Sequence, residues 1–330
     1  MNFISGSSTE LIRTINKLMH NVAISIIIPT YNRTIFLERA IRSVLMQTLP
    51  AYEIIIVDDG SDAKYLPELR RISQLSANIS LHHLPANSGV SQARNYGIII
   101  SRGNYLLFLD DDDAIHPEMF ETAASAFKES DKIDIVIFGC NILSENKYSH
   151  DLHQIYYLFC YKDFANSPIR RWLDKLHKTN QINELEKNPF SVILKSCPAI
   201  NACLIRKDAI GNCVFQKDLV FGEDWYFWLS LAYKGCRFKA KPNYYAYVQR
   251  HDNNTTRSTE RFYHNITNCL KRVVESGMLK SREDRFNIQA RFLLAYFKKA
   301  KLVDLRELFF IIKAPHLALK LLLCYLFERL

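Results

Sequence analysis

The chain has 330 residues, 48% of them hydrophobic and 23% charged, which is enough for a large core in one domain or in one domain with an appendage. An aromatic content of 12% with only ten Gly and ten Pro excludes disordered, collagen-like and low-complexity chains. The net charge of +9 comes from 43 Lys and Arg against 34 Asp and Glu, but no nucleic-acid recognition module accompanies it, so we expect no nucleic-acid partner.

The first 21 residues contain isolated apolar residues and no continuous apolar run. They do not resemble a signal peptide, and we expect a short lead-in before the folded domain. Eight cysteines are scattered along the chain without a C-x-x-C pair or zinc-ligand spacing. Together these features predict a reduced, cytoplasmic protein.

Alternating strands and helices are predicted for the first 140 residues. Short, nearly continuous apolar runs indicate buried strands at residues 22–28, 53–57, 79–84, 105–109 and 133–138. Helical spacing of apolar residues occupies the intervals, at residues 34–48, 66–75, 89–99 and 117–129. The alternation predicts an α/β fold with a Rossmann-like, open, mostly parallel sheet that is flanked by helices on both faces.

The second half of the chain is less regular. Residues 140–195 show no clear period, and strands are predicted again at residues 201–207 and 239–248. A helix that starts near Glu223 lies between these two strands, and the pattern is helical from about residue 261 to the end. We expect this half to carry fewer strands of the sheet.

The last seventy residues, 261–330, hold fourteen Lys and Arg against six Asp and Glu, a surplus of eight. Lys313, Pro315, His316 and Lys320 interrupt the apolar segment 305–330, so it lacks the run of about 18 uncharged residues that a membrane span needs. We predict peripheral association of residues 301–330 with an anionic membrane surface. A solvated basic helical face, docked on the body, is the alternative.

Polar residues directly follow three of the predicted strands. Tyr31 and Asn32 follow the first, Asp58 and Asp59 follow the second, and residues 110–113 follow the fourth. In open α/β sheets, ligands bind beyond the carboxyl ends of the strands. These side chains are therefore expected to meet at one rim.

The most acidic strand end is the run Asp110, Asp111, Asp112 and Asp113. Carboxylates this close repel one another and raise each other's pKa. A hard divalent ion such as Mg2+ or Mn2+, which shares its ligand shell with substrate phosphates, would neutralise them. The alternative is a solvated acidic turn that caps the helix predicted from residue 117.

Two further motifs fit a nucleotide site at the same rim. Asp58-Asp59-Gly60-Ser61 could accept hydrogen bonds from a base or ribose, or could be an ordinary capped turn. Arg94 lies one turn into a helix that begins at a glycine, where a guanidinium suits a diphosphate or a base. A surface arginine is the alternative.

Two candidates lie far along the chain. Gly222-Glu223-Asp224-Trp225 stands at a predicted helix start, where a carboxylate could act as general base on an acceptor hydroxyl or could simply stabilise the helix terminus. His251 follows the last predicted strand and could bind a metal or phosphate, although a lone histidine is often structural.

Taken in order, these elements resemble the inverting family 2 glycosyltransferases with the GT-A fold, a type found in bacterial polysaccharide synthesis. The resemblance runs from Ile24 to about Ser258, roughly two thirds of the chain. It rests on six motifs in register: Pro29-Thr30-Tyr31-Asn32-Arg33, Val57-Asp58-Asp59-Gly60-Ser61, Asn87 through Gly97, Phe108-Leu109-Asp110-Asp111-Asp112-Asp113, Gly222-Glu223-Asp224-Trp225, and Tyr247-x-x-Arg250-His251.

The resemblance implies roles for the matching residues. Asp224 would be the catalytic base, with Glu223 in support. Asp112 would bind a Mn2+ or Mg2+ ion, with Asp110 and His251 as further ligands. The donor-binding residues would be Pro29, Tyr31, Asn32, Arg33, Asp58, Asp59, Arg94, Asp110 and Asp111. Asp111 stands where the family often has Ser, and its extra charge leaves open which aspartate contacts the metal.

The resemblance also implies the organisation and the activity. We expect a lead-in at 1–21, a GT-A domain at 22–258 with a nucleotide-binding half (22–139) and an acceptor half (140–258), and a helical extension at 259–330. Acceptor contacts are expected in residues 140–200 and 198–203. The expected reaction is inverting transfer from a nucleotide-sugar, by default a UDP-sugar, to a glycan or lipid-linked acceptor at the inner face of the cell membrane.

Three alternatives are weaker. A sugar nucleotidyltransferase would share the sheet and metal, but it should carry a Gly-rich basic loop where this chain has Pro29-Thr30-Tyr31-Asn32. A dinucleotide oxidoreductase would need G-x-G-x-x-G, which is absent. A non-catalytic nucleotide-sugar-binding protein would bind the donor and never turn it over.

Overall fold

The computed structural model describes residues 22–144, 147–149, 183–195, 197–250, 259–285 and 288–289. The predicted lead-in (1–21), His251 and the basic tail (301–330) lie outside these residues, as does most of the irregular segment 140–195. Among the described helices, none has both the length and the apolar character that crossing a bilayer requires.

The chain divides into two units. The first comprises Met1–Gln154, Ala199–Val214 and Cys236–Gln249. The second comprises Ile155–Pro198, Phe215–Gly235 and Arg250–Leu330. The boundaries that we expect at residues 139 and 258 stay predictions.

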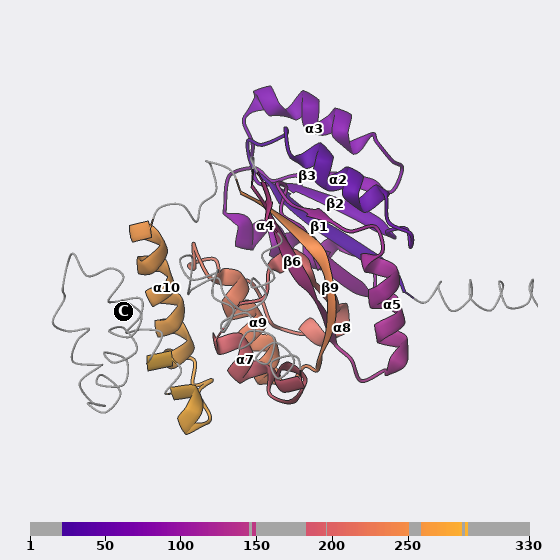
Figure 1. Ribbon diagram of the computed structural model, residues 1–330. Helices are drawn as coiled ribbons and strands as arrows, with labels where there is room; N and C mark the ends of the chain where they lie inside the picture. The colour runs from indigo at the N-terminus through magenta and orange to yellow at the C-terminus, as the bar shows by residue number, and fades with distance from the viewer. Residues whose placement is uncertain are drawn as a thin grey trace, which may run out of the picture. The chain divides into compact units, whose positions relative to one another are not determined.

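The described residues contain nine strands, all in one sheet. They are β1 (Ile24–Thr30), β2 (Glu53–Asp58), β3 (Ile79–His83), β4 (Tyr105–Phe108), β5 (Ala114–Ile115), β6 (Ile135–Ser144), β7 (Lys147–Ser149), β8 (Cys203–Arg206) and β9 (Phe238–Arg250). The strand order is β3-β2-β1-β4-β8-β6-β9-β5, with β7 paired to β6 (Figure 1). Strands β3, β2, β1 and β4 are mutually parallel, as predicted.

The helices alternate with the strands in the first unit and gather in the second. The first unit has α2 (Leu37–Leu45), α3 (Leu66–Ser73), α4 (Val90–Ile100), α5 (Met119–Glu129) and α8 (Lys207–Ile210), with short 3-10 turns η1 (Ala63–Tyr65) and η2 (Ile200–Ala202). The second unit has α7 (Pro189–Lys195), α9 (Glu223–Lys234) and α10 (Thr259–Glu275). The predicted α/β fold, an open and mostly parallel sheet flanked by helices, is confirmed.

Strand β8 is the main departure from the predicted order. The predicted strand 133–138 is β6, but β8 lies between β4 and β6 and runs antiparallel to both. It comes from residues almost a hundred positions further along the chain, so the local pattern could not place it. The sheet is therefore mixed, with β3, β2, β1 and β4 parallel and β8 antiparallel to both of its neighbours.

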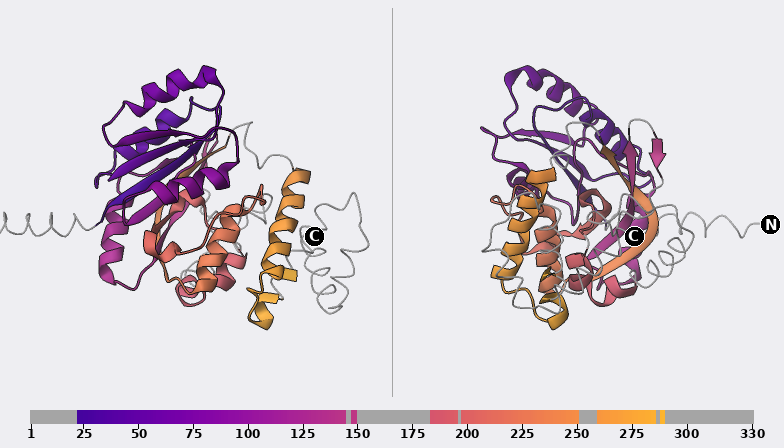
Figure 2. Two further views of the ribbon diagram at one scale, coloured as in Figure 1. Left: turned by 180° about the vertical axis from the view of Figure 1, so that it is seen from behind. Right: turned by 60° about the vertical axis from the view of Figure 1, so that its left-hand side comes forward.

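Strands β1, β2 and β4 are buried on both faces, which explains their continuous apolar runs. Ile24, Ile26 and Ile28 of β1 point to one face, into a core that includes residues of α2, α3 and α5. Ile27 points to the other face, where a Cβ added to Gly97 of α4 would lie 2.4 Å from its Cγ2. Helices α2 and α3 lie side by side (Figure 2), and Arg71 of α3 forms an ion pair with Glu38 of α2.

The second unit buries most of helix α9. The Trp225 indole donates a hydrogen bond to the Ile193 carbonyl of α7 at 2.6 Å, and Phe227 stacks on Phe215 with ring centroids 4.1 Å apart. Figures 1 and 2 show α10 alongside α9, and the Cys269 thiol of α10 contacts the Gly222 carbonyl at 3.3 Å. Gly222 has a φ of 76°, so a glycine suits the start of α9.

Candidate functional site

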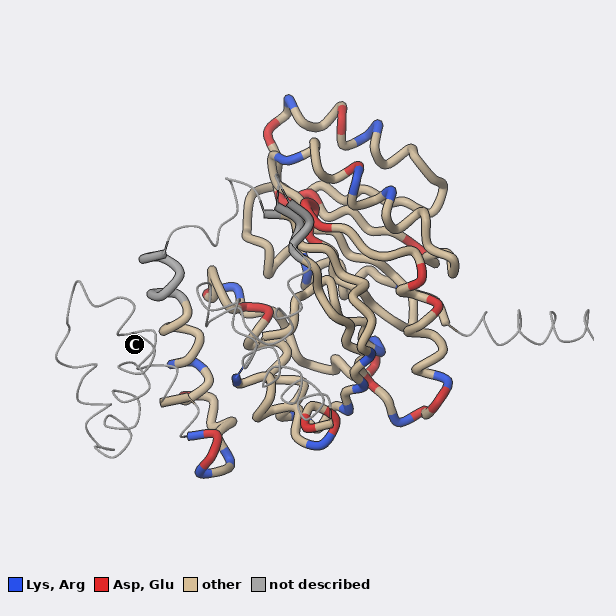
Figure 3. Tube along the Cα trace, in the orientation of Figure 1, with Lys and Arg blue, Asp and Glu red and all other residues tan. Residues whose placement is uncertain are grey.

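The carboxyl ends of β1, β2 and β4 share one edge of the sheet. Thr30 at the end of β1 is in register with Asp58 of β2, and Ile27 of β1 is in register with Phe108 of β4. Acidic positions gather where these strands end (Figure 3). The predicted rim is therefore present in the first unit, and its side chains come from loops that follow three parallel strands.

The loop after β1 is fixed to the loop after β2. Asn32 has a φ of 52°, a left-handed conformation that asparagine tolerates, and its N–H donates to the Ser61 hydroxyl at 2.7 Å. Its side-chain oxygen accepts the Asp62 N–H at 2.8 Å. Tyr31 next to it is 43% exposed. The amide of Asn32 thus positions the loop, while the Tyr31 ring presents a surface on which a base could stack.

Pro29 precedes this loop inside β1, one residue before the strand ends. It is in register with Val57 of β2 and lies beyond Ile27, the last residue of β1 that pairs with β4. A proline is tolerated there because no β4 residue needs its missing N–H. The strand ends at Thr30, two residues later than the predicted strand 22–28.

The end of β2 holds the neighbouring loops through its two aspartates. Asp58 is fully buried and accepts hydrogen bonds from the Ser61 N–H at 3.2 Å and from the His83 ring at 2.6 Å. Asp59 accepts the N–H groups of Ser88 and Gly89 at 2.9 and 2.7 Å. Each carboxylate oxygen has a second lone pair, so these bonds leave acceptor capacity for a ligand.

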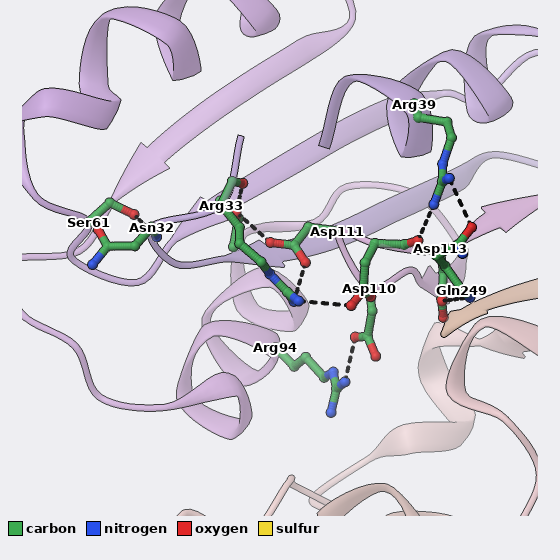
Figure 4. A network of polar contacts seen from close by, with 11 residues as sticks. Asn32, Arg33, Arg39, Ser61, Arg94, Asp110, Asp111, Asp113 and Gln249 are labelled. Carbon is green, nitrogen blue, oxygen red and sulfur yellow. Dashed lines mark hydrogen bonds and ion pairs between the residues drawn. The ribbon is translucent and has the colours of Figure 1, made fainter. Parts of the chain in front are cut away.

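The aspartate turn after β4 is surrounded by arginines (Figure 4). Asp110 pairs with Arg94 of α4 at 2.7 Å. The Arg33 guanidinium bridges two carboxylates, with Nη2 2.5 Å from Asp111 Oδ1 and Nη1 2.8 Å from Asp112 Oδ2. Adjacent negative charges are therefore stabilised by opposite charges.

A second set of contacts holds the backbone of this turn. Arg39 of α2 donates to the Asp112 carbonyl at 2.6 Å and to the Gln249 side chain at 3.0 Å. Asp113 accepts the Gln249 N–H and the Asn201 amide, both at 3.0 Å. Arg39 of helix α2 and Gln249 of strand β9 thus hold the turn (Figure 4), and Asn201 of turn η2 contacts it as well.

Burial disfavours the negative charge of this turn. It raises the pKa of the Asp111 carboxyl to about 7, although Arg33 and the Thr30 hydroxyl favour the charged form. Burial, together with Asp110 and Asp112, raises the pKa of Asp113 well above its ordinary range. For Arg33, burial opposes the charge, but the attraction of Asp111 and Asp112 outweighs it and raises the pKa. Additional positive charge would therefore stabilise the ionised turn.

Asp110 and Asp112 fit a divalent cation by their chemistry. Both offer the oxygen donors that Mg2+ and Mn2+ prefer. The Asp110 side chain is 33% exposed, and within the described ranges its Oδ2 contacts no partner. Among the residues that the structure describes, no group of three or more His, Cys, Asp or Glu could hold an ion. A cation held by these two carboxylates would take its other ligands from phosphates and water.

Asp224 and Glu223 belong to the second unit, in the first turn of α9. Both are partly exposed, and Asp224 Oδ1 accepts the Trp225 N–H at 2.7 Å. Carboxylates at this place stabilise a helix N-terminus whatever else they do. That Asp224 works with the carboxylates of the first unit stays a prediction.

Several residues of the rim were not predicted from the sequence. His83 is the last residue of β3, one position before the end of the predicted strand 79–84, so the strand-end argument could have found it. Arg39, Asn201 and Gln249 reach the turn from 73 to 136 positions away, and no local signal marks them. The acceptor contacts that we expect at residues 198–203 are not supported there, because η2 and Cys203 are buried and Asn201 holds Asp113 instead.

Known proteins resemble this chain in sequence. A family model described as "Glycosyl transferase family 2" matches residues 25–202, more than half of the chain. The minor teichoic acid biosynthesis protein GgaB of Bacillus subtilis (strain 168) is 26% identical over 297 residues, which are 87% of this chain and 30% of that protein. The uncharacterized glycosyltransferase EpsJ of the same organism is 31% identical over 209 residues, 63% of this chain and 55% of that protein.

The chain thus spans 30% of GgaB and 55% of EpsJ. A solved structure is also similar. The crystal structure of S. aureus TarS 1-349 in complex with UDP-GlcNAc has a TM-score of 0.58 and 20% identity, covering 83% of this chain and 72% of that chain. At this identity the likeness shows a common fold. The family model spans β1 to η2 and so includes the whole rim of the parallel strands, and the chain belongs to glycosyl transferase family 2, with a GT-A fold.

Proposed function

We propose that the protein is an inverting glycosyltransferase that moves a sugar from a nucleoside-diphosphate sugar to an acceptor hydroxyl. The observation that carries this proposal is the rim itself. Asp110 and Asp112 follow β4, between Arg33 of the β1 loop and Arg94 of α4. Carboxylates for a cation and guanidinium groups for a diphosphate are thus close together, and Tyr31 in the same β1 loop as Arg33 is exposed.

The donor class is supported by the solved relative. TarS was crystallised with UDP-GlcNAc and with UDP, so we propose a UDP-sugar for this chain. The nucleobase would stack on Tyr31 and donate a hydrogen bond to Asp59, which directly follows the neighbouring strand β2. Arg94 would bind the diphosphate through its planar guanidinium.

The leaving group is the nucleoside diphosphate. A divalent ion held by Asp110 and Asp112 would supply positive charge against the diphosphate as it departs. Arg94 is buried, and its pairing with Asp110 orients the guanidinium before the donor arrives. A charge that is oriented in advance costs no reorganisation during the reaction, and this accounts for much of the acceleration.

We propose Asp224 as the general base. It would take the proton from the acceptor hydroxyl while that oxygen attacks the anomeric carbon, and the bond to the diphosphate would break in the same step. Direct displacement inverts the anomeric centre. Glu223 would support Asp224 from the same helical turn, whose buried side, with Trp225 and Phe227, is packed firmly in the second unit.

The acceptor class rests on the curated relatives. GgaB is described as a minor teichoic acid biosynthesis protein. We therefore propose a glycan or lipid-linked acceptor of a cell-surface polymer, to which the basic apolar residues 301–330 would bring the protein by binding the membrane surface.

A product assay tests the proposal. The protein is incubated with a panel of nucleotide-sugars and Mn2+, and the slow hydrolysis of each donor is followed together with its effect on thermal stability. Release of a nucleoside diphosphate from at least one donor is the expected result. Release of pyrophosphate would identify a nucleotidyltransferase, and stabilisation by a donor that is never cleaved, even with acceptor, would identify a binding protein.

A further inference from the structure

Arg33 forms an ion pair with the carboxylate of Asp112, to which the proposed cation would bind. Its Nη1 lies 2.8 Å from Asp112 Oδ2, and its Nη2 lies 2.5 Å from Asp111 Oδ1 (Figure 4). The side chains of Asp111 and Asp112 are only 2% and 10% exposed, whereas that of Arg33 is 36% exposed. The guanidinium is therefore the part of this ion pair with room to move.

The two roles proposed for these residues conflict in this arrangement. Asp112 cannot give Oδ2 fully to a cation while Arg33 donates to it, and Arg33 cannot bind a donor while it bridges both aspartates. A buried carboxylate that loses an opposite charge is destabilised. A cation that takes the place of Arg33 at Asp112 would offset this cost.

The turn is built so that Arg33 can leave Asp112 without unfolding it. Arg39 holds the Asp112 carbonyl oxygen, not its carboxylate, so the backbone stays fixed when the side chain changes partner. Asp111 is held separately, because the Thr30 hydroxyl donates to its Oδ2 at 2.7 Å. Arg33 thus has one partner, Asp111, that Thr30 of β1 holds in place, and a second partner, Asp112, that it can release.

We propose that Arg33 is an exchangeable counter-cation: it occupies Asp112 when no divalent ion is bound, yields Asp112 to the ion while staying tethered to Asp111, and then binds the anionic diphosphate of the donor. This inference rests on the proposed function for its donor step. It gives Asp111, the second aspartate of the turn, a role as the fixed anchor of Arg33. It also makes the binding of cation and donor sequential, because the ion releases the group that recognises the diphosphate.

Arg94 differs from Arg33 in its exposure, its place in the fold and the freedom of its aspartate partner. It is buried, it lies inside α4, and its partner Asp110 keeps a second oxygen for a ligand. It needs no exchange before a cation binds. The fork geometry of Arg33 matters as well, because a lysine ammonium could not bridge two carboxylates through separate nitrogens in a fixed plane.

The first test titrates Mn2+ alone, without nucleotide, and follows the EPR signal of the free ion. The R33Q variant removes the competitor for Asp112, so we expect Mn2+ to bind tighter than to the wild type by about fivefold or more. R42Q is the matched control, because it removes one positive charge from a surface pair with Glu38 and should leave the Mn2+ affinity unchanged. Mn2+ affinity that is equal or weaker in R33Q would overturn the exchange.

The second test does not depend on a folded variant. Phenylglyoxal modification of Arg33 in the wild type is quantified by mass spectrometry without additions, with Mg2+, and with Mg2+ plus UDP. We expect slow modification of the paired guanidinium, faster modification when Mg2+ displaces it, and renewed protection by UDP. Modification that Mg2+ does not accelerate would contradict the exchange, and the absence of protection by UDP would contradict the donor step.

These outcomes separate the inference from the proposed function. Faster modification with Mg2+ in a protein that cleaves no nucleotide-sugar would support the exchange and refute the glycosyltransferase activity. Cleavage of a donor by a protein in which Mg2+ does not change the rate of Arg33 modification would support the glycosyltransferase activity and refute the exchange.

Discussion

At the scale of single residues, Asp224 allows a sharp distinction between chemistry and helix stability. Asp224→Asn keeps the size of the side chain and its hydrogen bond to the Trp225 N–H but removes the base. We expect unchanged donor binding and a loss of transfer of about 100-fold or more, the usual size of general base catalysis. Donor binding is measured by calorimetry and transfer by release of nucleoside diphosphate in the presence of acceptor.

Glu121→Gln supplies the matched control, since Glu121 is also an acid in the first turn of a helix, α5. It should leave transfer unchanged. If Asp224→Asn transferred sugar at the normal rate, the assignment of the base would be wrong.

Whether the role of a residue can be predicted from the sequence depends on how near its partners are along the chain. Asp59 and Asp110 stand out because a carboxylate at the end of a buried apolar strand is unusual and local in sequence. The partners of Asp113 are not local: Asn201, in the turn η2 that precedes β8, lies 88 positions away, and Gln249 lies 136 positions away. Asp111 is likewise predicted to bind the donor from its place after the strand. Its contacts to Thr30 and Arg33 depend on the packing of the β1 loop and are not visible in the sequence.

At the scale of elements, helix α4 is held against β1 by close contact at Gly97. A Cβ there would lie 2.4 Å from Ile27 Cγ2, well inside van der Waals contact, so Gly97→Ala must push α4 outward or distort Ile27. We expect a loss of about 1 to 3 kcal/mol in the free energy of unfolding, as for other overpacked cores. Donor binding should weaken too, because α4 carries Arg94.

Chemical denaturation measures the stability of this variant. Ile99→Ala on the exposed side of the same helix is the control, and it should change stability by less than about 0.5 kcal/mol. Equal stability of Gly97→Ala and the wild type would show that α4 does not pack as tightly as described.

The start of β2 provides a pH-dependent element at the opposite end of the strands from the rim. Glu53 accepts hydrogen bonds from the Ser25 hydroxyl at 2.7 Å and from the Arg102 N–H at 2.6 Å. Burial would raise its pKa, but these bonds and the Arg102 guanidinium outweigh burial and lower the pKa from the ordinary 4.5. Since the folded pKa is the lower one, Glu53 stabilises the fold above pH 4.5 and loses this contribution as the pH falls further.

We therefore expect Glu53→Gln to lose about 1 to 3 kcal/mol of stability at neutral pH, the cost of weakened charged hydrogen bonds. Its stability should also fall less steeply than that of the wild type when the pH drops below about 4.5. Urea unfolding at a series of pH values measures both. Parallel stability curves for the two proteins would contradict the role of Glu53.

Elements are predictable where burial is uniform along the chain. The runs that became β1, β2 and β4 are apolar on both faces, and this identifies parallel strands from sequence alone. Strand β5 has two residues and helix α8 has four. Both are too short to show a periodic pattern of apolar residues. The position of β8 between β4 and β6 is a long-range pairing, so only the folded chain determines it.

At the scale of the whole molecule, the charge distribution leads to a prediction about membranes. Residues 261–330 carry the surplus of eight positive charges, whereas the rest of the chain is nearly neutral. We expect the full chain to float with vesicles that contain phosphatidylglycerol and to remain unbound to neutral phosphatidylcholine vesicles. Binding should weaken as the salt concentration rises, because counterions screen the attraction.

Two substitutions localise this effect. Lys313→Glu with Lys320→Glu reverses two charges in the apolar segment, and it should reduce binding more than Lys132→Glu and Lys234→Glu, which make the same change elsewhere. Equal loss in the two double variants would show that total charge, and not residues 301–330, drives the association.

The central claim is that the carboxyl ends of β1, β2 and β4 bind a nucleotide-sugar together with a divalent ion. Calorimetric titration of UDP-GlcNAc into the wild type and into Asp112→Asn, each with and without Mn2+, tests it most directly. We expect the wild type to bind the donor in the presence of Mn2+ and Asp112→Asn to lose this metal-dependent binding. Binding by Asp112→Asn that is as tight and as responsive to Mn2+ as in the wild type would contradict it.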